Sequence, residues 1–298
     1  SFGVPQDDIL GKCFLVVLVI LRYPEGSNVL TIRVSSIMPT TIFKNISINY
    51  KVQGKGKTNV VLLHGFLESL EIWKEYSAAL AKSFTVISID LLGHGKSECI
   101  GYAHSMEEMA EAVNAVLKEL DVRKAVFVGH SLGGYVTLAF AEKYPDKMKG
   151  LCMFNSTAAP DSEQKKEDRL RAIDVVKYNP EIFVKVSIPN LYVDPDQHEA
   201  FIDKSYQIAS KTSKQGIIAA ITGMRNRLSR EIILKFVPCK TFYVIGKRDT
   251  VIPYEVAIEQ AKLNSEGTYY LSEEGGHMCF FEDPKTYAHL KKFIGSCA

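Results

Sequence analysis

The chain has 298 residues, of which 46% are hydrophobic and 23% are charged, and its formal net charge is +2. This size allows a large mixed core, and the nearly balanced charge, without basic patches, argues against nucleic acid or an anionic membrane as a partner. Six cysteines are scattered without a Cys-x-x-Cys pair, and no histidines are spaced as metal ligands. We therefore expect a reduced, cytoplasmic protein without a metal site.

The first 37 residues precede the regular pattern of the chain. The apolar run at residues 13–21 is well short of the roughly 20 residues that span a bilayer, so we predict no stable membrane insertion. Asp7 and Asp8 stand where a signal peptide needs positive charge. We predict that residues 1–37 are an extension without a catalytic role and that Met38 is the natural start. The alternative is that these residues form a buried accessory strand or a dimer contact. The sequence does not indicate the oligomeric state.

Strand and helix patterns alternate after this extension. Two adjacent alternating segments predict a hairpin at residues 42–46 and 48–53, and apolar runs predict buried strands at residues 59–63 and 84–89. Helical periodicity at residues 71–81 separates these two strands, and it returns, strongly, at residues 106–120. Strands that alternate with helices predict an α/β fold with a mostly parallel sheet and helices on both faces.

A serine lies at the next strand-to-helix junction. A buried strand at residues 124–128 leads into Gly129-His130-Ser131-Leu132-Gly133, and an amphipathic helix follows at residues 135–143. Glycines on both sides permit a sharp turn that exposes the Ser131 hydroxyl, as in a nucleophile elbow. The alternative is a serine that only shapes a turn. A strand at residues 150–154 follows this helix.

The alternation stops at residues 156–229. This stretch is helical in pattern, rich in charge, and broken by Pro180, Pro189 and Pro195. We predict a helical cap over Ser131, inserted into a core made of residues 38–155 and 230–298.

The two final strands are each followed by a residue that can complete a catalytic triad. The strand at residues 241–245 leads to Asp249, and the strand at residues 268–271 leads to His277. Carboxyl ends of parallel strands carry the sites of α/β folds, and serine, acid, histidine is the order of an α/β-hydrolase triad. Asp249 as a helix cap is the alternative. Asp283 is the nearest rival acid.

Backbone amides upstream and at the elbow can form an oxyanion hole. The strand at residues 59–63 runs into His64-Gly65-Phe66, so the N–H groups of Phe66 and Leu132 can stabilise charge on an attacked carbonyl oxygen. We expect His64, His94 and His130, which neighbour these motifs, to make structural hydrogen bonds.

Taken together, these motifs resemble the α/β-hydrolase superfamily in its cap-bearing, epoxide-hydrolase-like branch, from about Thr41 to the C-terminal region. The matching motifs are His64-Gly65-Phe66, Asp90-Leu91-Leu92-Gly93-His94-Gly95-Lys96-Ser97, Gly129-His130-Ser131-Leu132-Gly133-Gly134, Gly246 to Asp249, and Gly276-His277. A true epoxide hydrolase or haloalkane dehalogenase would carry aspartate in place of Ser131, so the serine argues against both of those activities. Carbon–carbon bond hydrolases of the family usually have asparagine before the serine and phenylalanine after it.

The resemblance implies a serine hydrolase that forms an acyl-enzyme through Ser131, His277 and Asp249 and needs no cofactor. We predict a small to medium, fairly apolar carboxylic ester as the substrate. Carbon–carbon cleavage of a diketone, thioester hydrolysis and perhydrolysis are the enzymatic alternatives, and a small-ligand receptor is the non-enzymatic one. Six residues beside the motifs are candidates for an apolar pocket or for the core: Phe66, Leu67, Trp73, Met278, Phe280 and Phe281.

Overall fold

The structure, a computed structural model, describes residues 14–21, 29–36 and 39–298. It divides the chain into two units, residues 1–39 and residues 40–298, and each is described by itself. In the first unit, strands β1 (Phe14–Leu21) and β2 (Val29–Ser36) form an antiparallel pair. Met38, the predicted start, and residues 1–13, 22–28 and 37 of the predicted extension lie outside the described residues.

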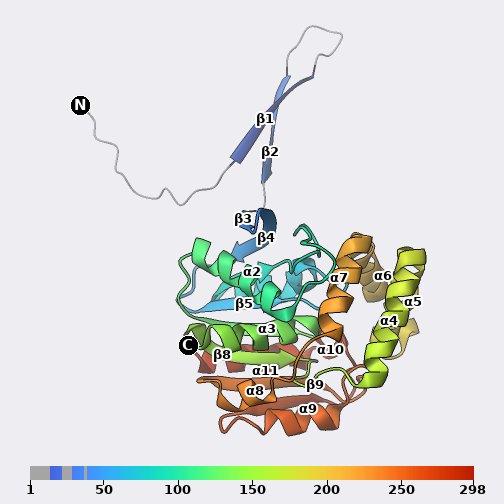
Figure 1. Cartoon of the computed structure of the whole chain (residues 1–298). Helices are drawn as coiled ribbons and strands as arrows, with labels where there is room; N and C mark the ends of the chain where they lie inside the picture. Colours follow the sequence, from blue (N-terminus) through green and yellow to red (C-terminus); the bar gives the residue numbers. More distant parts are fainter. Residues whose placement is uncertain (1–13, 22–28, 37–38) are drawn as a thin grey trace. The chain divides into compact units, whose positions relative to one another are not determined.

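The larger unit is built on an eight-stranded sheet with the order β10-β9-β8-β7-β5-β6-β4-β3 (Figure 1). The pairs from β10 to β6 are parallel, whereas β4 pairs antiparallel with both β6 and β3. This confirms the mostly parallel α/β sheet. The strands are β3 (Thr40–Phe43), β4 (Ile46–Gln53), β5 (Asn59–Leu63), β6 (Thr85–Ile89), β7 (Ala125–His130), β8 (Met148–Phe154), β9 (Lys240–Gly246) and β10 (Thr268–Ser272).

The hairpin at the sheet edge turns earlier than the sequence pattern indicated. Lys44 and Asn45 have positive φ angles of 47° and 67° and join β3 to β4, with Phe43 opposite Ile46. A two-residue turn with both φ angles positive matches the twist of a hairpin, and asparagine tolerates that conformation. The first strand therefore ends at Phe43, and the predicted strand over residues 42–46 was too long.

Helices cover both faces of the sheet, as predicted. Helix α3 packs on α2 and α8, and α11 packs on β9 and β10. The rings of Tyr76 on α1 and Tyr287 on α11 lie 5.4 Å apart and join these two helices. The helices of the core are α1 (Lys74–Leu80), α2 (Met106–Glu119), α3 (Leu132–Lys143), α8 (Glu231–Phe236), α9 (Tyr254–Ala261), α10 (Cys279–Glu282) and α11 (Lys285–Ser296).

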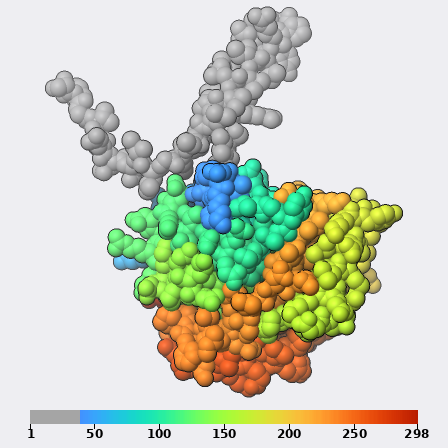
Figure 2. Space-filling view, in the orientation of Figure 1, coloured from blue at the N-terminus to red at the C-terminus, as the bar shows by residue number. Residues whose placement is uncertain are grey.

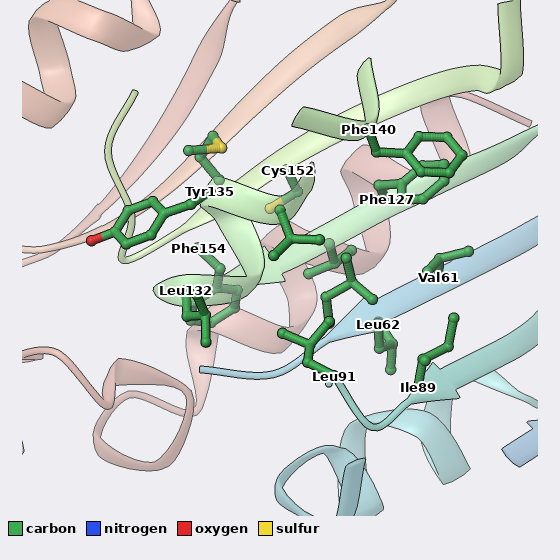
Figure 3. Packing of buried hydrophobic residues seen from close by; sticks show 14 of the residues in the cluster. Val61, Leu62, Ile89, Leu91, Phe127, Leu132, Tyr135, Phe140, Cys152 and Phe154 are labelled. Atoms are coloured by element: carbon green, nitrogen blue, oxygen red, sulfur yellow. The ribbon is translucent and has the colours of Figure 1, made fainter. Parts of the chain in front are cut away.

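The central strands are buried on both sides, which explains their nearly continuous apolar sequences. Figure 3 shows Val61 and Leu62 of β5 beside Phe127 of β7 and Phe140 of α3. The Phe127 and Phe140 rings lie 4.4 Å apart, and both side chains are fully buried. Burying each such side chain stabilises the fold by about 1.5–3 kcal/mol. The packed core therefore holds in place the strand ends that carry the polar residues.

The stretch between β8 and β9 is a helical insertion, at the place where the sequence predicted a cap. It contains α4 (Glu163–Tyr178), α5 (Pro180–Ser187), α6 (Glu199–Ala209) and α7 (Lys214–Arg225). Helix α4 packs on α5 and α7, and Figure 2 shows the yellow-green α4–α5 region against the orange α7 at one edge of the larger unit. Pro180 begins α5 because a proline fits the first turn of a helix. Within the described residues, no helix is long and apolar enough to cross a membrane.

Candidate active site

Ser131 sits on a strained turn between β7 and α3. Its φ and ψ angles are 47° and −112°, a conformation that costs a non-glycine residue about 1–3 kcal/mol. The turn is possible because a Cβ on Gly133 would lie 2.3 Å from the Leu63 carbonyl oxygen, so only glycine fits there. Ser156 Oγ donates to the Ser131 carbonyl at 2.7 Å and holds the turn in place. The predicted elbow is thus present in the structure.

The structure brings the three predicted triad residues together. Ser131 Oγ lies 3.0 Å from His277 Nε2, and His277 Nδ1 lies 2.9 Å from Asp249 Oδ2. The imidazole tautomer that satisfies both contacts donates from Nδ1 to Asp249 and accepts at Nε2 from the serine. That tautomer can take a proton from Ser131.

Asp249 is held as a buried carboxylate. Burial acts to raise its pKa, but the charge and hydrogen bond of His277 and the N–H groups of Ile252 and Val251 lower the pKa below its usual value. Helix α9 starts only at Tyr254, with Pro253 at its cap position, so Asp249 shapes the preceding turn and does not cap the helix.

The hydrogen bonds of Asn155 and of Asp283, the rival acid, explain the positions of both side chains. Asn155 Nδ2 donates to Asp249 Oδ2 at 3.1 Å and to the Gly276 carbonyl at 3.0 Å, which joins the two loops that carry the acid and the histidine. Asp283 instead accepts from Tyr270 and Ser272, at 2.6 and 2.7 Å.

Two backbone amides are available where the sequence predicted the oxyanion hole. Leu132 is the first residue of α3, and the first N–H groups of a helix have no acceptor within the helix. Within residues 39–298, the Phe66 amide has no backbone hydrogen bond, and Phe66 lines the cavity at Ser131. The helix dipole adds a further partial positive charge at this end of α3.

A second histidine–carboxylate pair lies directly behind the triad. His130 Nδ1 donates to Glu68 Oε2 at 3.1 Å, and its Nε2 lies 3.1 Å from the His277 carbonyl oxygen. Both ring nitrogens face acceptors, and the imidazolium form can donate to both. Burial acts to lower the pKa of His130, but the Glu68 carboxylate outweighs burial and raises that pKa. Glu68 Oε2 also accepts from Gly65 N at 2.6 Å, so the pair connects the Phe66 loop to the His277 loop.

The other motif histidines make structural hydrogen bonds, as predicted. His64 Nδ1 donates to the Gly65 carbonyl at 2.8 Å, and its Nε2 accepts from Leu91 N at 2.9 Å, which fixes the neutral form. Burial lowers the pKa of His64, and it lowers the pKa of His94 to about 3. Within the described part of the chain, no three His, Cys, Asp or Glu side chains are placed to hold a metal ion.

A cavity of about 100 Å³ opens at Ser131 and has two walls. We call the side formed by the sheet and its loops the core wall: Phe66, Leu67, Glu68, His130, Ser131, Tyr135, Val251 and His277. We call the side formed by the inserted segment the cap wall: Arg169, Ser187, Leu191 and Met224.

Of the six predicted pocket candidates, only Phe66 and Leu67 line this cavity. Trp73, Met278 and Phe280 are buried in the core, where the Trp73 and Phe280 rings lie 5.4 Å apart. The reason is that α10 begins just after His277 and packs the Phe280 ring 5.0 Å from the ring of His130 in the core.

The sequence patterns above assign no role to Glu68 or Arg169, and they exclude Asn155 as the triad acid without assigning it another role. Glu68 lies three residues after His-Gly in an apolar stretch, and Asn155 follows a buried strand. A polar residue in apolar surroundings is a signal that could have identified both. Arg169 is one of many charged residues on α4 and carries no such signal.

A family model described as the alpha/beta hydrolase fold matches residues 58–284. Among solved structures, a thermophilic esterase from Thermogutta terrifontis, with malate bound, is 29% identical with a TM-score of 0.81 and covers 87% of this chain and 97% of its own. The enol-lactonase of Burkholderia xenovorans has the same TM-score at 18% identity, covers 86% of this chain and 100% of its own, and shows a shared fold.

Curated relatives cover a similar part of the chain. The putative carbamate hydrolase RutD of Pantoea ananatis is 25% identical over 80% of this chain and 89% of its own length. The dihydrolipoyllysine-residue acetyltransferase component of the acetoin cleaving system of Pseudomonas putida is 28% identical over 78% of this chain. That match spans only 62% of the length of the acetyltransferase component.

Proposed function

Because this chain belongs to the alpha/beta hydrolase fold family, we propose that it is a serine hydrolase that cleaves small carboxylic esters. The observation that carries the proposal is the line of hydrogen bonds from Ser131 Oγ through His277 to Asp249, at 3.0 and 2.9 Å. This line ends at a cavity next to two free backbone amides, which is the arrangement that acyl transfer needs.

The proposed reaction has two halves. His277 takes the proton of Ser131 while Ser131 Oγ attacks the ester carbonyl, and Asp249 stabilises the imidazolium that forms. The amides of Phe66 and Leu132 hold the oxyanion, and each is worth about 3 kcal/mol in the transition state. His277 then protonates the departing alcohol. A water activated by the same histidine releases the acid and restores Ser131.

The cavity supports the small end of the predicted substrate range. Its volume of about 100 Å³ is well below the roughly 300 Å³ at which drug-sized pockets begin. Leu191 and Met224 on the cap wall and Phe66 on the core wall supply apolar contacts. A short ester therefore fits better than a long acyl chain.

The cysteines support the proposed cytoplasmic location. The five cysteines within residues 39–298 are all free thiols, which is usual in a reducing compartment.

The test compares wild type with Ser131→Ala on p-nitrophenyl esters from acetate to decanoate. We expect turnover of the short esters, and a loss of at least about 10⁴-fold in kcat for Ser131→Ala. Ser187→Ala is the matched control because Ser187 lines the same cavity on the cap wall, whereas the hydroxyl that His277 Nε2 contacts is that of Ser131. It should keep activity within severalfold.

A fluorophosphonate probe with mass spectrometry adds a readout that needs no substrate. It should label wild type and Ser187→Ala but leave Ser131→Ala unlabelled. Turnover that survives in Ser131→Ala would reject the proposal. If Ser131 is labelled but no ester turns over, the site is a nucleophile for another reaction, such as carbon–carbon or thioester cleavage. If neither occurs, the small-ligand receptor remains.

A further inference from the structure

We propose that the substrate of this site is an ester that itself carries a carboxylate, and that Arg169 on the cap wall binds that carboxylate. The inference rests on the proposed ester hydrolysis and names its substrate class. It comes from an imbalance of charge beside the cavity, where cations outnumber the carboxylates that pair with them.

One buried carboxylate serves two guanidinium groups. Asp161, whose side chain is fully buried, pairs with Arg169 and also with Arg227, whose Nη1 lies 2.7 Å from Asp161 Oδ1. Burial acts to raise the pKa of Asp161, but the two arginines outweigh it and keep the carboxyl ionised. Within residues 39–298, Asp161 is the only ion-pair partner found for Arg169. The two guanidinium groups and the one carboxylate therefore carry a net charge of one positive unit.

A third cation lies on the same face of α4. Lys165 precedes Arg169 by one turn, and its Nζ donates to the carbonyl of Val251, a core-wall residue, at 3.2 Å. Burial lowers the pKa of Lys165, and the positive charge of Arg169 lowers it further. Three basic side chains thus stand near Asp161, and the only other carboxylate whose charge is found to act on Lys165 within residues 39–298 is Asp249, which pairs with His277.

The carboxylates of the neighbouring core are already committed. Glu68 pairs with His130 and accepts from Gly65 N. Asp249 pairs with His277 and accepts from two backbone amides. Within residues 39–298, neither carboxylate forms an ion pair with Arg169, so the ion pairing of Arg169 rests on Asp161, which it shares with Arg227.

Arg169 is the member of this cluster that faces a ligand. Arg227 is fixed, because its guanidinium lies 4.1 Å from the centre of the Tyr135 ring and donates to the Met224 carbonyl at 2.9 Å. Arg169 lines the cavity itself, and its side chain keeps 16% exposure.

A carboxylate is the chemical group that best fits this place. A guanidinium that is largely removed from water without a full counter-charge is unfavourable, and a bound anion would relieve that cost. Arg binds carboxylates through planar, often paired hydrogen bonds. Because Arg169 and Ser131 line the same small cavity, the carboxylate and the scissile ester must be separated by only a few atoms.

The experiment compares two esters that differ only in charge: monoethyl succinate and its neutral amide, ethyl succinamate. A second pair, acetoxyacetate and acetoxyacetamide, places the charge on the alcohol side. Hydrolysis is followed by titration of the released acid. For at least one pair, we expect wild type to prefer the anion by about tenfold or more in kcat/KM, the range of a charge-assisted hydrogen bond.

Three variants assign that preference to Arg169. Arg169→Gln should bring the ratio of kcat/KM for the anion to kcat/KM for the amide down towards one, whereas Arg169→Lys should keep part of the preference. Arg171→Gln is the matched control, because Arg171 lies on the same helix but is exposed and pairs with Asp168. It loses the same charge and should keep the preference.

The outcomes separate this inference from the proposed function. If wild type hydrolyses anion and amide equally well, or Arg169→Gln slows both equally, the substrate assignment is wrong while ester hydrolysis stands. Calorimetry of succinate with the Ser131→Ala protein gives a readout without turnover. Binding of succinate that requires Arg169 supports the anion site even if no ester is hydrolysed. Absence of ester hydrolysis would then count only against the proposed function. Absence of both binding and preference overturns the inference.

Discussion

The core wall of the cavity holds its charges in matched pairs, whereas the cap wall holds more cations than carboxylates. On the core wall, Glu68 pairs with His130, and His277 pairs with Asp249 behind it. On the cap wall, Arg169 shares the carboxylate of Asp161 with Arg227. The elements differ as well, since the core wall stands on sheet strands and the loops that follow them, whereas the cap wall stands on inserted helices.

This difference indicates a division of labour. Matched pairs fix geometry, because each buried charge is held by a partner from another loop. An unmatched cation instead leaves a binding position for an anion. We therefore expect changes on the core wall to alter kcat and stability, and changes on the cap wall to alter substrate preference. Four further predictions test this contrast, beginning with the largest effect.

Asp249→Asn should cost about 10⁴-fold in kcat with little change in fold, because an amide favours the wrong tautomer of His277. The measurement is kcat on a short p-nitrophenyl ester, with circular dichroism to check the fold. Asp283→Asn is the control, since Asp283 bonds Tyr270 and Ser272 and not the histidine. If Asp283→Asn lost as much activity as Asp249→Asn, the acid assignment would be wrong.

Glu68→Gln should lower the free energy of unfolding by about 3–5 kcal/mol, because it leaves a buried imidazolium without its carboxylate. Denaturant titration measures this, and Glu71→Gln is an exposed acidic control three residues further on, in the short helix Leu70–Trp73. Combining Glu68→Gln with His130→Gln should recover part of the loss. A strictly additive double variant would show that the pair does not act as a unit.

The raised pKa of His130 predicts a specific pH dependence of stability. A group whose pKa is higher in the folded state stabilises the fold fully below its unfolded pKa, about 6.5, and loses that contribution as pH rises through the folded value. The stability gap between wild type and Glu68→Gln should therefore be widest near about pH 6 and should narrow at alkaline pH. A gap that widens with rising pH would contradict the imidazolium.

Ser162→Ala should have the smallest effect, about 1 kcal/mol of local stability at the start of α4. Ser162 Oγ accepts from Lys165 N at 3.2 Å and caps the helix that carries Arg169. Hydrogen exchange of the α4 amides should quicken, while kcat stays unchanged because the core wall is untouched. Ser162→Asp, which keeps the cap, is the control. A large fall in kcat for Ser162→Ala would contradict the expectation that changes on the cap side leave kcat unaffected.

The sequence predicted Ser131, Asp249 and His277 as a triad, and the structure places their side chains within hydrogen-bond distance. The oxyanion role of the Phe66 and Leu132 amides stays a prediction. Each of these residues lies in a short motif at the end of a strand, and parallel strands bring those ends to one edge of the sheet. The mostly parallel sheet and the helical insertion were also predictable, because apolar strands and amphipathic helices alternate and the alternation then stops.

The charge pairs around the triad were not predictable. Glu68 and His130 are 62 positions apart and meet only through the packing of their loops. The cluster at Asp161 depends on how α4 and α7 cross, which no local pattern encodes. Phe280 and Trp73 were ambiguous for the same reason, since an aromatic residue beside a motif can face the cavity or the core.

The position of the insertion also has a consequence for how this protein can change. Strands β8 and β9 are neighbours in the sheet, yet residues 155–239 lie between them in the chain. Loop-closure entropy grows slowly with length, at about 0.6 kcal/mol for each doubling. The segment that forms the cap wall can therefore be lengthened, shortened or exchanged with little effect on strand pairing. New substrates can in this way be acquired by altering one stretch of helices, while the reacting groups keep their places.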